Sequence, residues 1–262
     1  MPYQNIRLER RDGVATLTLD RPQAANSIDI PLARELMEAA IVCDDDPEIR
    51  AVVLTGTGPV FSAGGDLRSF GEAGPAIGGR LKELTVYLHA AISRLARMDA
   101  PVIAAVNGIA AGAGFSLAIA ADLTIASETA AFIMAYTNAG LVPDGSSTFF
   151  LPRRIGDRRA RELMLTNRRL SAAEALDWGL VNRVVAADQL LPAATTLAAT
   201  LAAGPTRAFG ATKALLNESF EHGLEAQMEL EARAIAAASI GHDGQEGIRA
   251  FLEKRKPTFS GT

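Results

Sequence analysis

Two glycine-rich segments of this 262-residue chain could act on a ligand through the backbone. Residues 56–67 read GTGPVFSAGGDL, and residues 107–115 read NGIAAGAGF. Each follows an apolar run and leads towards a predicted helix, where small residues permit close approach and unpaired N–H groups carry partial positive charge. Two such turns could direct two backbone N–H groups at one oxygen. The alternative, that these glycines serve only tight turns and helix–strand packing, stays open on spacing alone.

Composition excludes several other kinds of site. Position 61 is Phe, which breaks a Gly-x-Gly-x-x-Gly nucleotide motif, and no Gly-Lys-Ser/Thr follows the second segment. A single cysteine, Cys43, cannot form an internal disulfide, and three scattered histidines without a His-Glu-x-x-His run predict no metal site. Acidic residues outnumber basic ones by 30 to 26 without any basic block, which argues against nucleic-acid and membrane partners.

The elements that position these turns follow an α/β rhythm. Residues 5–19 alternate around Asp12-Gly13 and predict a β-hairpin. Short apolar strands then alternate with amphipathic or buried helices, which predicts mostly parallel pairing. The expected strands are 51–55, 101–106 and 123–126, and the expected helices are 31–43, 79–98 and 112–121. After residue 157 the pattern is helical, with a turn and a short strand within 177–181. No apolar run reaches a membrane span and the first residues lack an apolar signal core, so we expect a cytoplasmic protein.

Six stretches, in order along nearly the whole chain, resemble the crotonase, or enoyl-CoA hydratase/isomerase, family. They are Arg21-Pro22 with Asn26, and the segments 61–67, 107–122, 140–144, 172–181 and 251–255. The resemblance implies a spiral of ββα units in residues 1–200, which would hold an acyl-CoA site. It also implies a C-terminal helical oligomerisation region in residues 201–262 that forms a homotrimer or a dimer of trimers.

In this family two backbone N–H groups hold the thioester oxygen, and the resemblance places them on Gly65 and Ala113. Ala113 stands where many members have glycine, which a backbone donor tolerates. Removing a proton beside a thioester, or adding a nucleophile to its conjugated alkene, puts negative charge on this oxygen, and preorganised donors stabilise that state. The substrate carries coenzyme A itself, so no further cofactor and no metal is expected.

Hydratases of the family use two glutamates, and both are missing here. Their positions fall on Ser116 and Tyr136. Both side chains could form hydrogen bonds to water or substrate, but neither is a good general base near neutral pH. An enoyl-CoA hydratase with an atypical site therefore stays an alternative. A non-catalytic acyl-CoA-binding scaffold is a third reading, which the absent glutamates favour.

One carboxylate remains in the right neighbourhood, Asp144 in GLVPDGSS. Its place is similar to the single catalytic acid of Δ3,Δ2-enoyl-CoA isomerases and especially of ring-1,2-epoxyphenylacetyl-CoA isomerases. The resemblance therefore predicts a proton-shift isomerase, in which Asp144 takes a proton from one carbon and returns it two carbons away. The same PDGSS run is also typical of a turn with a helix N-cap, and the two roles are compatible.

The resemblance also supplies candidate contacts to coenzyme A. The backbone of a turn and the first glycine-rich segment would flank adenine and pantetheine, through Gln23, Ala24, Ala25, Ala63 and Leu67. The adenine and 3′-phosphate would meet Phe251 and Lys254, from a neighbouring subunit. Without the resemblance, Lys254-Arg255-Lys256 is a solvated basic helix end.

The remaining candidates are expected to be structural. Asp66 is expected to cap a turn, Asp122 to bind backbone, and Trp178 to pack the helical region. His89 lies on an amphipathic helix, where a surface or core role is preferred over catalysis. Segment 68–80, rich in Gly and Ala, is expected to form a mobile wall of the acyl pocket.

Overall fold

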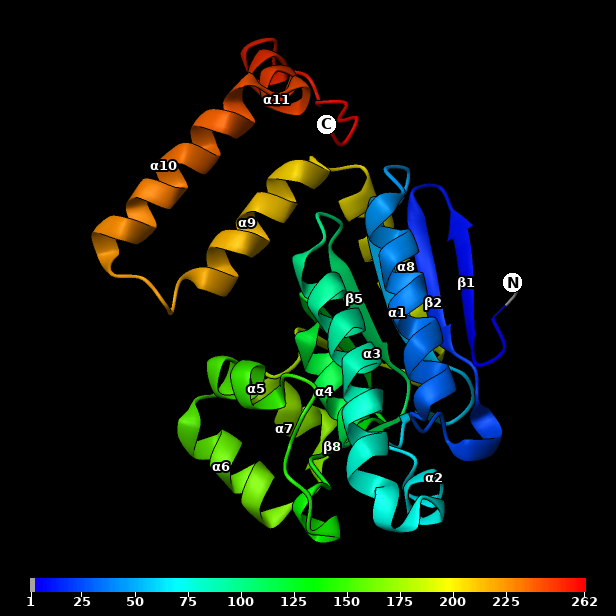
Figure 1. Cartoon of the computed structure of the whole chain (residues 1–262). Helices are drawn as coiled ribbons and strands as arrows, with labels where there is room; N and C mark the ends of the chain where they lie inside the picture. Colours follow the sequence, from blue (N-terminus) through cyan, green and yellow to red (C-terminus); the bar gives the residue numbers. More distant parts are fainter. Residues whose placement is uncertain (1–2) are drawn as a thin grey trace.

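A computed structural model describes residues 3–262 of the chain. It repeats a unit of one long strand, one short strand and helix (Figure 1). The three successive units contain β3 (Ala51–Gly56), β4 (Val60–Ser62), α2 (Leu67–Glu72) and α3 (Ile77–Arg97); then β5 (Val102–Val106), β6 (Ile109–Ala111) and α4 (Ala113–Ala120); then β7 (Leu123–Ser127), β8 (Ala131–Ile133) and α5 (Ser147–Ile155). The predicted spiral of ββα units is confirmed.

The long strands form a six-stranded sheet in the order β1-β2-β3-β5-β7-β10. Its first pair, β1 (Ile6–Arg11) and β2 (Val14–Leu19), is the predicted antiparallel hairpin. The other pairs are parallel, out to β10 (Arg183–Val185). Residues 51–55 are all buried, as expected of a continuous apolar run in a parallel strand covered on both faces.

The short strands form a second sheet in the order β4-β6-β8-β9, where β9 is Leu170–Ser171. Three of these strands have three residues, too few to show an alternating pattern, so the sequence did not predict them. Strands β4 and β6 are parallel neighbours. Because the carboxyl ends of adjacent parallel strands lie at one edge, both glycine-rich turns leave the small sheet side by side.

Helices cover both faces of the large sheet. On one face lie α1 (Ile30–Asp45) and α3, side by side in Figure 1. The side chain of Asp29 caps α1 by accepting a 2.9 Å hydrogen bond from Leu32 N. On the other face, α8 (Leu190–Ala202) buries a stripe with four-residue spacing: Leu190, Ala194, Ala198 and Ala202. These layers hold the strand ends that carry the turns.

Segment 68–80, expected to form a wall of a pocket, is mostly helical, because Asp66 caps α2 and a short 3-10 turn then joins α2 to α3. One local prediction was wrong in detail. The strand expected within 177–181 lies later, at β10, because the residues after α7 (Ala172–Asp177) form a turn whose N–H groups bond back to that helix. Helix α6 (Asp157–Thr166) begins where the helical pattern is expected to start.

The chain ends in α9 (Thr206–Glu218), α10 (Leu224–Ile240) and α11 (His242–Leu252). Helices α10 and α11 extend away from the body of the molecule (Figure 1). None of the residues of α10 is buried, although it carries large apolar side chains such as Leu224, Met228 and Ile235.

The Lys213 side chain links α9 to the core through an ion pair and hydrogen bonds. It is 8% exposed, and its Nζ lies 2.8 Å from Asp122 Oδ2 and donates to the carbonyls of Leu95 and Ala100. Asp122 also accepts a 2.8 Å hydrogen bond from Val102 N, so it binds backbone as predicted. This ion pair joins the C-terminal helices to the start of β5.

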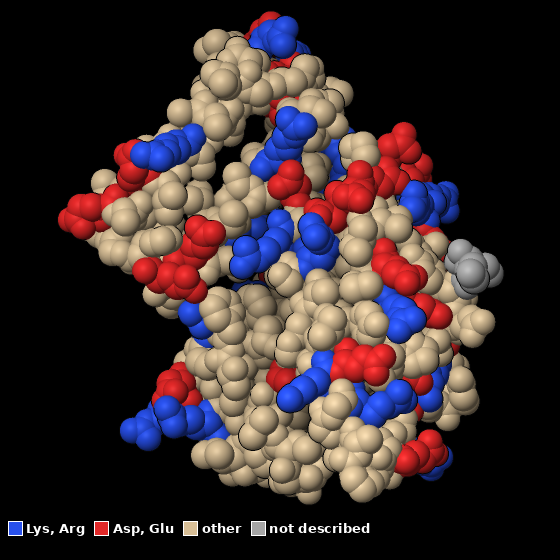
Figure 2. All heavy atoms as spheres, viewed as in Figure 1, with Lys and Arg blue, Asp and Glu red and all other residues tan. Residues whose placement is uncertain are grey.

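Charges of both signs are interspersed over the face in Figure 2, without a broad patch of one sign. Within residues 3–262, no helix combines the length and apolar character needed to cross a bilayer.

We predict that Lys213→Met destabilises the protein by about 3–5 kcal/mol at about pH 7, because it leaves a buried carboxylate unpaired. Burial already raises the pKa of Asp122, against the lowering effect of Lys213. As the pH falls below the raised folded-state pKa, the unpaired Asp122 of the variant binds a proton in the folded state, while the unfolded chain stays ionised down to about pH 3.9. The penalty of the buried charge is thereby relieved, so the defect should shrink towards about pH 5. Denaturant unfolding at both pH values measures this, with exposed Lys82→Met as control. An equal defect at both pH values would contradict the charge argument.

Candidate active site

The two glycine-rich turns are in direct contact. Gly64 has φ +89°, and a Cβ added there would lie 2.7 Å from Ala111 O and 3.2 Å from Ala113 N. Gly112 likewise has φ +49°, with its own added Cβ 3.7 Å from Gly64 Cα. Only glycine at position 64 permits this approach, because any side chain would push the second turn away. The glycine at position 64 therefore sets the spacing between the backbone amides of Gly65 and Ala113.

Those amides, Gly65 N and Ala113 N, have no hydrogen-bond acceptor within residues 3–262. Ala113 is the first residue of α4, where an N–H has no partner inside the helix. Both residues line the same cavity. The structure thus brings together the two predicted donors at one cavity, with the positive end of a helix behind one of them.

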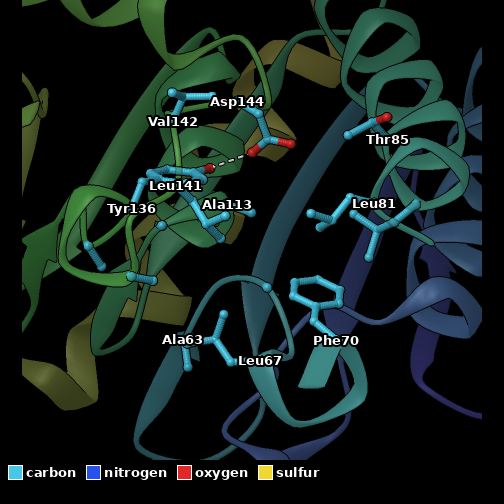
Figure 3. Close-up of a pocket in the computed structure, with 15 residues that line it drawn as sticks. Ala63, Leu67, Phe70, Leu81, Thr85, Ala113, Tyr136, Leu141, Val142 and Asp144 are labelled. Atoms are coloured by element: carbon cyan, nitrogen blue, oxygen red, sulfur yellow. Dashed lines mark hydrogen bonds between the residues drawn. The ribbon is translucent and has the colours of Figure 1, made fainter. Parts of the chain in front are cut away.

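The cavity has a volume of about 250 Å³ and mostly apolar walls. Figure 3 shows Tyr136, Leu141 and Val142 on one side of the cavity and Leu81 and Thr85 of α3 across from them, with Ala63, Leu67 and Phe70 below. Phe70 and Leu67 come from α2, and Phe70 lies within segment 68–80, which the sequence predicts as a wall of an acyl pocket. An apolar cavity strengthens any electrostatic contact made inside it.

Asp144 supplies the one carboxylate that lines this cavity within the described residues. Its side chain is 28% exposed and points into the space between its own loop and α3 (Figure 3). Tyr136 Oη donates a 2.7 Å hydrogen bond to Asp144 Oδ1. The carboxylate does not cap α5: the backbone carbonyl of Asp144 accepts from Ser147 instead, and Ser146 occupies the cap position.

Tyr136 and Ser116 form the support behind this acid. Burial, and then the negative charge of Asp144, raise the pKa of Tyr136, so its phenol stays a neutral donor. Ser116 is fully buried, with Oγ 3.0 Å from Tyr136 Oη and 2.9 Å from the Asp144 carbonyl oxygen. Both residues are expected to contact the substrate. Tyr136 lines the cavity, whereas Ser116 does not and lies behind Tyr136.

His89 is the residue of the site that the sequence did not predict. Its Nε2 lies 3.5 Å from Asp144 Oδ2 and accepts a 3.3 Å hydrogen bond from Gly145 N. A signal was available, because Leu81, Thr85 and His89 follow one another at four-residue spacing and so share one face of α3. The pattern alone gave no reason to place that face beside Asp144.

The predicted contacts to coenzyme A fall into two groups. A polar hollow that adjoins the cavity, and shares Ala63, Gly65 and Leu67 with it, is also lined by Gln23, Ala24 and Ala25. Asp66 lies at its rim, where it caps α2 as predicted and forms a 2.7 Å ion pair with Arg21. Phe251 and Lys254, by contrast, are exposed at the end of α11 and line neither the hollow nor the cavity.

Parallel ββα units here present two backbone N–H groups and one carboxylate to an apolar cavity, an arrangement whose main-chain donors could stabilise an oxyanion. A family model described as enoyl-CoA hydratase/isomerase matches residues 9–262. The chain therefore belongs to the enoyl-CoA hydratase/isomerase, or crotonase, family.

Several relatives share this family. The chain is 40% identical over 253 residues to 1,2-epoxyphenylacetyl-CoA isomerase of Escherichia coli K12, covering 95% of both chains. It is 40% identical over 240 residues to 4-chlorobenzoyl coenzyme A dehalogenase-2 of an Arthrobacter species, covering 91% of this chain and 86% of the relative. The crystal structure of an enoyl-CoA hydratase from Polaromonas sp. JS666 superposes with a TM-score of 0.91 at 36% identity, over 97% and 99% of the two chains.

We predict that Gly64→Ala lowers kcat/KM for an acyl-CoA substrate by about 10²–10³, the usual cost of losing one oxyanion donor. The added methyl would collide with Ala111 O and separate the two amides. Gly156→Ala is the matched control, since Gly156 has φ +81° but nothing within 4 Å of its added Cβ. Both variants should lose about 1–3 kcal/mol of stability from backbone strain, measured by thermal unfolding. Equal activity in the two variants would contradict the proposed amide geometry.

Proposed function

We propose that this enzyme isomerises an enoyl-CoA, or a ring-epoxide CoA thioester, by a proton shift through an enolate held by the two amides. The observation that carries the proposal is the presence of one cavity carboxylate, Asp144, facing a pair of free N–H groups. A 1,3-proton shift needs one base that acts twice, whereas hydration needs groups that handle a water and a proton separately.

In the proposed reaction, the thioester oxygen accepts hydrogen bonds from Gly65 N and Ala113 N. The carboxylate of Asp144 removes a proton from the carbon next to a double bond, and the charge moves to the thioester oxygen, where the amides stabilise it. Asp144 then delivers the proton two carbons away. Its Oδ1 is held by Tyr136, so Oδ2 is the oxygen free to carry the proton. No cofactor beyond the coenzyme A of the substrate takes part.

The hydratase and scaffold alternatives are less well supported. Tyr136 and Ser116, at the places of the two glutamates, are committed to each other and to Asp144, and Tyr136 is held as a neutral phenol. A scaffold would have no use for a carboxylate oriented by a buried hydrogen bond beside free amides. Turnover in ¹⁸O water tests hydration, because label in a hydroxyacyl product requires it.

A second candidate function is hydrolytic removal of an aromatic halide. Two dehalogenases named for 4-chlorobenzoyl coenzyme A are 40% identical to this chain over 240 residues. Attack at the aromatic carbon would also send charge to the thioester oxygen, and His89 beside Asp144 offers an imidazole base for a water. Overall, water and the aryl chloride would give a phenol, chloride and a proton. Chloride release from 4-chlorobenzoyl-CoA, without a proton shift in any enoyl-CoA, would favour this function over isomerisation.

We predict that Asp144→Asn lowers the rate of proton shift by about 10²–10⁴, the typical contribution of a general base. Asparagine keeps the shape and can still accept from Tyr136, so the melting temperature and acyl-CoA affinity should change little. The measurement is NMR of double-bond position across a panel of enoyl-CoAs, with exposed Asp45→Asn on α1 as control. Undiminished turnover in the Asp144 variant would remove Asp144 from the mechanism.

We also propose that residues 201–262 assemble the chain into a homotrimer or a dimer of trimers. Support comes from the exposed apolar side chains of α10 and from Phe251 and Leu252, which are 82% and 73% exposed. In such an assembly Phe251 and Lys254 would reach the coenzyme A hollow of a neighbouring copy, which accounts for their distance from their own. A mass in solution of three or six chains is expected, and a monomer would contradict the assignment.

A further inference from the structure

Two cavities lie in line along α3, with His89 between them. The first is the acyl cavity, which α3 borders with Leu81, Leu84 and Thr85. The second, of about 830 Å³, begins at His89 and Gly145 and runs on past Arg97, Phe149, Asn217 and His222. His89 has a half-exposed side chain, whereas that of Asp144 is 28% exposed. The imidazole therefore stands between the carboxylate and a larger, more polar space.

The hydrogen bonds at Asp144 give its two oxygens different roles. Oδ1 accepts from Tyr136, whose raised pKa prevents it from releasing a proton to the bulk. Oδ2 faces His89 Nε2 at 3.5 Å, a separation that one small rotation would close to hydrogen-bond length. Nε2 accepts from Gly145 N, which requires a lone pair on Nε2 and so the neutral tautomer with hydrogen on Nδ1. The imidazole atom nearest Oδ2 is thus a proton acceptor.

We infer that His89 relays protons between Asp144 and water in the second cavity, and so sets how much of the transferred proton is exchanged with solvent; the inference rests on the proposed proton-shift function. After Asp144 removes a proton from substrate, Oδ2–H passes it to Nε2, whose lone pair gives up the long hydrogen bond from Gly145 N, leaving a carboxylate and an imidazolium. The imidazolium releases its Nδ1 proton to water and returns to a neutral ring. The reverse sequence supplies Oδ2 with a solvent proton. His89 is a positioning and relay residue, because it acts on substrate only through Asp144.

The test is isomerisation of a protiated enoyl-CoA in D₂O, with the deuterium content of the product read by mass spectrometry and NMR. The wild-type product should carry solvent deuterium at the newly protonated carbon. His89→Gln keeps an acceptor for Gly145 N but cannot carry a proton. It should lower the ratio of exchange to internal return at least about tenfold, given the usual contribution of acid–base groups, while kcat falls much less.

The matched control is His222→Gln, which removes the other histidine of the second cavity, one that pairs with Glu218 and not with Asp144. It should exchange like wild type. His89→Gly adds a rescue arm: added imidazole should restore exchange without changing the position of the double bond in the product.

The outcomes separate the two claims. Isomerisation with exchange unchanged in His89→Gln, or an equal loss in His222→Gln, overturns the relay and leaves the isomerase assignment standing. Absence of any proton shift or exchange in wild-type enzyme across the panel overturns both. Loss of exchange in His89→Gln alone, restored by imidazole in His89→Gly, supports both.

Discussion

The close approach of the turns at Gly64 and Gly112 is the constraint on which the site depends. Two backbones can come this near only where the first turn carries no Cβ, since an added methyl at Gly64 would reach 2.7 Å from Ala111 O. The register of β4 with β6 brings the turns to one edge, and the buried α4 fixes the direction of Ala113 N. Main-chain atoms held by a sheet and a helix are rigid, so in the proposed reaction the two amides would need no reorganisation to act as oxyanion donors.

The chemistry available opposite these donors follows from how the polar groups are distributed. Asp144 is held by a neutral phenol and not by a cation or a second acid, and Ser116 holds that phenol in turn. Such a network orients the carboxylate without neutralising it, and every member has a partner, which lowers the cost of placing it beside an apolar wall. One oriented base and two amides suffice for a proton shift, whereas two-acid hydration lacks a second group.

The fold was predictable to the extent that its elements are long and periodic. The hydrophobic pattern predicts a continuous apolar strand such as 51–55 and an amphipathic helix such as α3. It does not predict three-residue strands such as β4 and β6, which are too short to show a pattern. The amides and Asp144 came from the ordered resemblance, because turn spacing alone equally fits tight packing. The sequence predicts a structural role for His89. Its contact with Asp144 could not be predicted, because it joins α3 to a loop more than fifty residues later. Only tertiary structure brings those segments together.

The architecture also separates the two amides from the apolar wall of the cavity. The donors belong to strand ends of the small sheet, whereas the acyl cavity is walled by Leu67 and Phe70 of α2 and by one face of α3. A change of shape in α2 alters the space for the acyl group without moving β4 or β6. Leu81 and His89 lie two turns apart on the same face of α3. Leu81 lines the apolar wall of the cavity, and His89 contacts the carboxylate of Asp144. A shift of α3 by a single residue would therefore move His89 away from Asp144 and change the shape of the cavity at Leu81 at the same time. The fit of a substrate and the surroundings of the carboxylate thus depend on the position of one rigid helix.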